Sequence, residues 1–193
     1  MKNSSGIIGA IVLAAALCAC ARTIPGFQDA EQVAAKAIRA ISTDDWSALA
    51  AVADPRHGVR FSPYAFVDTS TNVVLSPAEI AAFASDSRQR RWGTYDGSGD
   101  SIELTIGQYF DRFVSDRMYA NAERGAPNER IGRSNTIDNV RDVYAGLDVV
   151  SFEYHAPGTD KHAGMDWRSL RLVLERTEGQ WHLIGVVHDE WTI

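Results

Sequence analysis

Apolar residues recur at helical spacing in the first half of the chain and at alternate positions towards its end. Residues 29–41 place Val33, Ala37, Ile38 and Ile41 on one helical face. A second helix is expected from Trp46, with Thr43 or Asp44 as its N-cap. Further helices are predicted at 76–84, 105–114 and 137–144, the first two behind capping boxes. Short strands are predicted at 57–67, 73–75 and 147–154, and loops at 91–100 and 121–135.

The clearest element is a β-hairpin at 167–193, turning at Glu178-Gly179. A two-residue turn fits because glycine accepts the positive φ that hairpin turns require. Pairing outward from the turn predicts one mostly apolar face, with Leu174 opposite Leu183, Leu172 opposite Gly185, and Arg168 opposite Asp189. The other face is mixed and carries Trp167, Ile184 and Val186. Either a neighbouring segment covers this outer face, or it forms a homodimer or a protein-binding surface.

Helices that precede an antiparallel sheet, with the longest strands last, predict an α+β fold. We expect N-terminal helices packed on a curved antiparallel sheet. The length suits one domain, at 28–193, after a leader at 1–19 and a tether at 20–27.

The leader contains Lys2 and an apolar run, Gly6 to Leu17, that is too short for a stable membrane span. It ends in Leu17-Cys18-Ala19-Cys20, which resembles the bacterial lipobox. That resemblance implies cleavage before Cys20, lipidation of Cys20, and a lipid-anchored protein of the cell envelope. Ala21 rather than Asp after the cysteine favours the periplasmic side of the outer membrane. The alternative is an ordinary secreted protein cut after Ala19 or Ala21.

The net charge of −6 argues against a nucleic-acid partner, because such proteins carry an extended basic surface. Arg88, Arg90 and Arg91 form a basic cluster too short for that role, and we interpret it as a solvated helix end. Cys18 and Cys20 are the only cysteines. The mature domain is therefore expected to have no disulfide and no thiolate site.

The paired N-terminal helices, with Asp44-Asp45-Trp46 between them, and the terminal strand pair resemble the nuclear-transport-factor-2-like superfamily, whose fold is cone-shaped. The segments HGVRFSPYA (57–65), WGTYDGSG (92–99), MDWRSLRL (165–172) and GVVHDEWTI (185–193) are also similar to an uncharacterised family of bacterial envelope proteins. These resemblances imply the cone fold but no particular activity, because the fold serves isomerases, dehydratases and binding modules.

The predicted register brings polar residues together at the open end of the cone. We expect a ligand-binding rim formed by Asp166, Arg168, Asp189, Trp191 and Tyr154. Pairing with Arg168 would keep Asp189 ionised, which favours a structural or ligand-orienting pair over a general base.

No metal site or cofactor is predicted. His182 and His188 share the predicted outer face but lie six residues apart, roughly 20 Å along a strand. Asp96, Ser98 and Asp100 begin like a calcium loop, but Ser101 and Gly107 occupy the positions where that loop needs glycine and a bidentate acid. We therefore expect non-enzymatic binding of a small molecule or a protein. The alternative is a cone-pocket isomerase or dehydratase.

Overall fold

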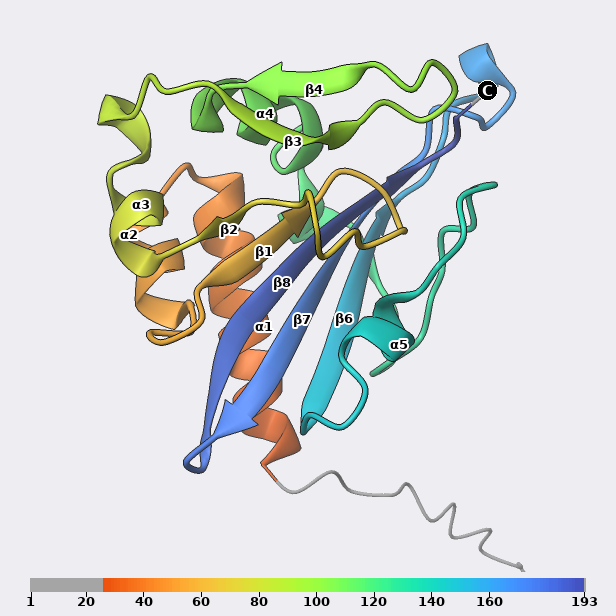
Figure 1. Ribbon diagram of the computed structural model, residues 1–193. Helices are drawn as coiled ribbons and strands as arrows, with labels where there is room; N and C mark the ends of the chain where they lie inside the picture. Colours follow the sequence, from red (N-terminus) through yellow and green to blue (C-terminus); the bar gives the residue numbers. More distant parts are fainter. Residues whose placement is uncertain (1–25, 193) are drawn as a thin grey trace, which may run out of the picture.

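The computed structural model describes residues 26–192, so the leader and Cys20 lie outside the described part. Its main sheet has six strands in the order β2-β1-β8-β7-β6-β5. The strands are β1 Val59–Ser62, β2 Val74–Leu75, β5 Glu123–Arg124, β6 Val149–Ala156, β7 Arg168–Thr177 and β8 Gln180–Glu190. Neighbours are antiparallel except β1 and β8, which run parallel. Figure 1 shows the sheet curving across the molecule.

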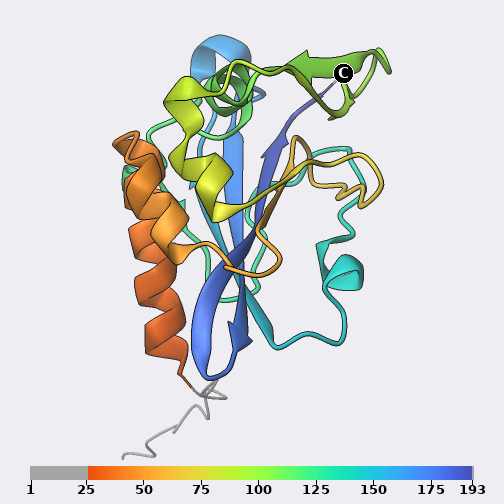
Figure 2. The ribbon, with the colours of Figure 1, turned by 60° about the vertical axis from the view of Figure 1, so that its left-hand side comes forward.

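The α-helices are α1 Phe27–Ser42, α2 Trp46–Val52, α3 Pro77–Ala81, α4 Ile106–Phe113 and α5 Val140–Val143. Helices α1 to α4 cover one face of this sheet, which we call the inner face, and α5 lies on the other (Figure 2). Short 3-10 turns occur at Phe83–Ser85, Tyr119–Asn121 and Asp160–His162. Helix α1 packs on β7 and β8, and a separate hairpin, β3 Arg90–Thr94 with β4 Ser101–Leu104, lies across the top (Figure 1). The predicted α+β class is confirmed.

The local signals for helix starts are largely confirmed. Ser76 with Glu79 and Thr105 with Gln108 form reciprocal capping boxes at α3 and α4. The predicted cap of α2 is wrong, because Asp45 caps it by accepting a hydrogen bond from the Ala48 N–H at 2.9 Å. Asp44 has a φ of 52° and belongs to the preceding turn.

The predicted hairpin turn is confirmed, and its register holds only near the turn. Glu178 and Gly179 both have positive φ, at 54° and 82°, which is the requirement of a type I′ turn. The expected pairs persist as far as Leu174 with Leu183. There a β-bulge adds one residue to β8, so Val173 pairs with Gly185 and Leu172 with Val186.

This bulge exchanges the two faces of β8 for every residue beyond it. Gly185 was expected on the inner face opposite Leu172, but it lies on the outer face beside Val173. Conversely, Val186 joins the inner core and His188 contacts Phe113 of α4. The predicted pairing of Arg168 with Asp189 is lost for the same reason.

Aromatic side chains fill the space between the sheet and its helices. The rings of Trp92 and Tyr109 stack with centroids 3.8 Å apart, and Phe61 and Phe110 pack at 5.0 Å. Phe113 is buried beside them. Residues 91–100 were predicted as a loop; the first four of them belong to β3, which places Trp92 in this core, and the remaining six form the turn before β4. The cone is therefore packed with side chains at its centre.

Residues 125–144, which we call the outer-face segment, cross the opposite side of the sheet. Figure 2 shows α5 of this segment on the far side of the sheet from α1. Val140 and Tyr144 form a second apolar cluster with Val173 and Ile184. Of the two alternatives for the outer face, the structure thus shows a neighbouring segment covering Ile184.

Within residues 26–192, no helix is both long and apolar enough to span a membrane.

Candidate functional site

The expected rim residues do not come together. Arg168 lies on the inner face, where its Nη2 is 2.9 Å from Glu190 Oε2. Asp189 lies on the outer face and accepts a hydrogen bond from Arg130 Nη2 at 2.7 Å. The predicted Arg168–Asp189 pair is therefore wrong, because the bulge in β8 turns the two side chains to opposite faces.

The other three expected rim residues are also dispersed. Asp166 is in the loop before β7 and accepts hydrogen bonds from the backbone N–H and hydroxyl of Thr159. Trp191 follows β8 with 42% of its surface exposed. Tyr154 is buried in the inner core, and burial raises its pKa to about 12.

An ionic network occupies the inner face near the end of β8. Asp116 Oδ2 is 3.3 Å from His188 Nε2 and 3.2 Å from Arg168 Nε, while its Oδ1 accepts from the Tyr119 hydroxyl at 2.7 Å. Glu190 bridges Arg168 and Arg112, whose Nη2 lies 2.6 Å from Glu190 Oε1. Both carboxylates are thus fully paired.

His188 completes this network. Its Nδ1 lies 3.1 Å from the Pro63 carbonyl oxygen, and its Nε2 faces the Asp116 carboxylate. The buried ring is thus in contact with a polar partner through each of its nitrogens. Burial opposes ionisation of Asp116, but the hydrogen bond and charge of His188 outweigh it and hold the pKa of Asp116 below its usual value. Asp116 therefore has a contact with His188, Arg168 and Tyr119 at the same time.

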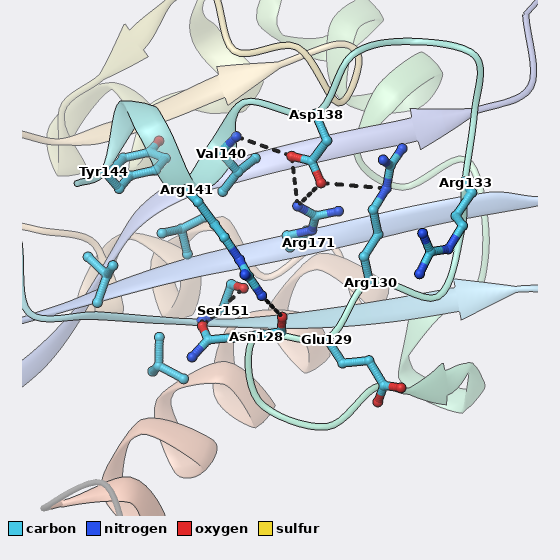
Figure 3. Close-up of a pocket in the computed structure, with 13 residues that line it drawn as sticks. Asn128, Glu129, Arg130, Arg133, Asp138, Val140, Arg141, Tyr144, Ser151 and Arg171 are labelled. Carbon is cyan, nitrogen blue, oxygen red and sulfur yellow. Dashed lines mark hydrogen bonds and ion pairs between the residues drawn. The ribbon is translucent and has the colours of Figure 1, made fainter.

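The outer face carries a cavity of about 360 Å³ between the sheet and the outer-face segment. We call it the arginine cavity (Figure 3). Its walls come from the outer-face segment including α5, and its floor from β6 and β7. It is lined by Asn128, Glu129, Arg130, Arg133, Asp138, Val140, Arg141, Tyr144, Val149, Val150, Ser151, Arg171 and Val173.

Two buried carboxylates and one half-buried carboxylate hold two of its four arginines. Arg171 donates from Nη1 to Asp138 at 2.9 Å and lies 3.2 Å from Glu153 through Nη2. Arg130 bridges Asp138, at 3.6 Å, and Asp189, at 2.7 Å. Glu153 also accepts the backbone N–H of Gly132 at 2.7 Å, which ties the outer-face segment to the sheet.

The two aspartates of this network have opposite pKa shifts. Burial opposes ionisation of Asp138, but the charge of Arg171 outweighs it and lowers the pKa of Asp138. Burial dominates at Asp189 and raises its pKa despite the hydrogen bonds from Ser134 and Arg130. Asp138 is therefore the firmly ionised acid in the wall of the cavity.

The remaining two arginines, Arg133 and Arg141, have no carboxylate within ion-pair distance among residues 26–192. Arg141 donates only to the Asn128 carbonyl oxygen, at 3.1 Å. Both side chains reach the cavity from the outer-face segment, and Figure 3 shows them on either side of Arg130. A guanidinium without an acidic partner is free to bind an anion in a bidentate way.

Sequence reasoning missed this cavity because residues 121–135 were expected to be an exposed loop. One signal was present: Arg171 interrupts the apolar run of β7, and Glu153 interrupts that of β6. Charged residues in central strands need buried partners. That requirement indicates a covering segment, although it does not identify which one.

A second, more open cavity of about 610 Å³ lies between residues 63–72, the β3–β4 hairpin and residues 135–137. Tyr64, Tyr95 and the half-exposed Phe66 line it, together with Asp68 and Asp96. Asp96 accepts hydrogen bonds from Thr136 and Thr192. Among residues 26–192, the lining of this cavity includes two aspartates and neither arginine nor lysine.

No protein-family model matches the chain, and no curated protein sequence does either. Solved structures resemble it in fold. One is an NTF2-like protein with a cystatin-like fold from Novosphingobium aromaticivorans, at 12% identity and a TM-score of 0.42, covering 88% of this chain and 84% of that one. Another is Aln2 from a Streptomyces species, at 15% identity and a TM-score of 0.38, covering 87% of this chain and 92% of that one.

A third is described as a calcium/calmodulin-dependent protein kinase II association domain from Xanthomonas campestris, at 14% identity and a TM-score of 0.33, covering 87% of this chain and 91% of that one. The protein is of the α+β class, with helices on a curved, mostly antiparallel sheet. At these identities and TM-scores the likeness bears on neither activity nor ligand.

Proposed function

We propose that this protein binds a small organic anion in the arginine cavity and carries out no chemistry on it. The observation that carries the proposal is the presence of Arg133 and Arg141, which face one cavity without carboxylate partners. Guanidinium groups bind carboxylates and phosphates through paired, charge-assisted hydrogen bonds. The chain as a whole has a net negative charge, so a group of arginines around one cavity differs from the overall charge of the protein.

The construction of the cavity supports binding to a preformed site. Arg130 and Arg171 are fixed by Asp138, Glu153 and Asp189, so the floor and one wall are held in place before a ligand arrives. A volume of about 360 Å³ is at the small end of the range for ligand sites.

The apolar part of the lining narrows the ligand class. Val140, Val149, Val173 and Tyr144 line the same cavity as the arginines. The ligand that fits this mixture has a carboxylate or phosphate head and a short apolar portion.

We further infer that the protein is anchored to a bacterial envelope membrane by lipid on Cys20. Gly26, the first described residue, accepts a hydrogen bond from Trp181 Nε1 at 3.0 Å, beside the hairpin turn. Residues 20–25 would extend at most roughly 20 Å from this point. Under this proposal the hairpin-turn end of the sheet faces the membrane.

The filled cone supports binding rather than isomerase or dehydratase activity. Phe61, Trp92 and Phe110 occupy the centre, and the inner acids Asp116 and Glu190 are paired with cations. An enzyme of that type needs an open apolar pocket with an acid or base of tuned pKa.

Calorimetric titration of the lipid-anchored protein in mild detergent tests the anion site. The probes are inorganic phosphate, succinate and hexanoate, each titrated at constant ionic strength. Arg133→Ala and Arg141→Ala should each weaken binding of the best probe by about tenfold, the loss of one charged hydrogen bond. Arg91→Ala is the matched control, because Arg91 is exposed and lies outside the cavity. The proposal fails if no probe binds, or if Arg91→Ala weakens binding as much as the cavity variants.

A further inference from the structure

Three potential metal ligands converge on the sheet near the hairpin turn. Asp54, His57 and Glu175 each offer one ligand atom, and these atoms all lie within 4.8 Å of one another. Asp54 and His57 follow α2, whereas Glu175 comes from β7, more than a hundred residues later. The tertiary structure alone brings them together.

Asp54 is the unusual member of this group. Its side chain is completely buried, and Oδ1 accepts the backbone N–H groups of Arg56 at 2.9 Å and His57 at 2.6 Å. Oδ2 is buried as well and has no hydrogen-bond partner. A buried carboxylate oxygen without a partner lowers the stability of the fold. A cation or a hydrogen-bond donor would remove this penalty, and residues 26–192 provide neither to Oδ2.

His57 and Glu175 complete the group and are free to move. The His57 side chain is 72% exposed, and its Nδ1 lies 3.6 Å from Asp54 Oδ1. Glu175 is half-buried and forms no ion pair with any described residue. Its cross-strand partner His182 borders a cavity of about 270 Å³ together with Asp54.

We propose that Asp54, His57 and Glu175 bind a divalent transition-metal ion, with zinc as the best fit. Zinc accepts both imidazole nitrogen and carboxylate oxygen as ligands, and with three protein ligands water would take the fourth position beside His182. Tetrahedral zinc requires ligand atoms about 3.4 Å apart. The group therefore has to contract slightly, and the side chains of His57 and Glu175 can make this movement.

The surrounding charges favour a cation at this position. Arg56 borders the same cavity, but its Nη1 lies 3.4 Å from Glu178 Oε1, so these two charges offset each other. Asp54 and Glu175 then leave two negative charges for the ion. A bound ion would join the segment after α2 to the terminal hairpin.

Zinc binding to the full-length, untagged protein, stripped with a chelator, tests the proposal. Calorimetric titration with zinc gives the affinity, and the visible absorption of a cobalt(II) complex reports tetrahedral ligation by nitrogen and oxygen. Glu175→Gln and His57→Ala each remove a ligand and should weaken binding by at least about 10–100-fold. Asp54→Asn keeps Oδ1 as an acceptor for the turn, so it should fold and still lose zinc affinity.

Glu178→Gln is the matched control, because Glu178 borders the same cavity but lies outside the ligand group. It should weaken zinc binding by no more than about threefold, because both Glu178 and the Arg56 that it leaves unpaired are solvent-exposed and screened. A protein that binds no zinc at millimolar concentration would overturn the proposal. So would a Glu178→Gln variant that loses as much affinity as Glu175→Gln, because the binding would then reflect general negative charge.

Discussion

Gly185 lies under the phenol ring of Tyr144, and a side chain at this position should destabilise the protein. A Cβ at residue 185 would lie 2.6 Å from Tyr144 Oη and 3.2 Å from its Cζ. It would also lie 3.2 Å from Val173 Cβ on the neighbouring strand. The contact with Oη is shorter than real Cβ atoms allow, so Gly185→Ala forces the ring of Tyr144 to move.

The expected loss of stability in Gly185→Ala results from overpacking. Extra methyl groups in a packed region reduce stability by about 1–3 kcal/mol. We expect the lower half of this range, because the colliding atom is the end of a side chain that borders the arginine cavity and can shift into it. For a domain of this size the change corresponds to a Tm about 2–8 °C lower.

A double-mutant cycle with Tyr144→Phe isolates the cause. The Tyr144 hydroxyl is buried without a hydrogen-bond partner, so removing it alone should be neutral or slightly stabilising. In the double variant the ring atom nearest to the new Cβ is Cζ, at 3.2 Å. Part of the stability lost in Gly185→Ala should therefore be recovered. We expect a coupling free energy of about 0.5–1 kcal/mol, near the lower end for residues in contact.

Urea denaturation followed by tryptophan fluorescence measures all four proteins. Gly107→Ala in α4 is the control, because its Cβ would meet no atom closer than 3.8 Å and alanine favours the helix. That variant should be as stable as wild type or more so. Strict additivity of Gly185→Ala and Tyr144→Phe would refute the packing of Tyr144 over Gly185.

Three further outcomes are expected. Glu153→Gln should lower the free energy of unfolding in urea by about 1.5–3 kcal/mol, because it removes the fully buried one of the two acids that pair with Arg171 and leaves Asp138 as the other; a negligible change would contradict the burial of this pair. Asp116→Asn should destabilise most above about pH 5 and progressively less below about pH 4, because a folded-state pKa held below the ordinary value gives stability that is lost as pH falls. Urea titrations across this range measure the difference, and a penalty that grows on acidification would reverse the assigned sign. Cys20→Ala should release the protein from the membrane fraction and abolish incorporation of labelled fatty acid; a variant that stays membrane-bound would disprove the anchor.

Signals carried by a few adjacent residues predicted the local structure well. The capping boxes at Ser76 and Thr105 and the turn at Glu178-Gly179 each depend on contacts within about four residues. Their physical causes are therefore contained in the local sequence. The alternation in β7 also placed Leu170, Leu172 and Leu174 correctly in the inner core.

The predicted rim was wrong because of the β-bulge in β8, which the alternation of apolar and polar residues does not reveal. The bulge after Leu183 moved Asp189 to the outer face and His188 to the inner face, so the expected rim was never assembled. A period-two pattern has no position for an extra residue, and one insertion reverses every side chain beyond it. Gly185 was a hint, since glycine within a strand often marks a bulge.

The sequence by itself determined the α+β class, the capping boxes of α3 and α4, the hairpin turn and the acidic character of the protein. These features follow from local geometry and composition, which no distant residue changes. Only the tertiary structure decided that the outer-face segment lies over β6 and β7 and brings Arg133 and Arg141 to one cavity. It also decided that Asp54 meets Glu175. Both arrangements join residues far apart in the chain, and they are set by which surfaces pack together with their buried charges paired.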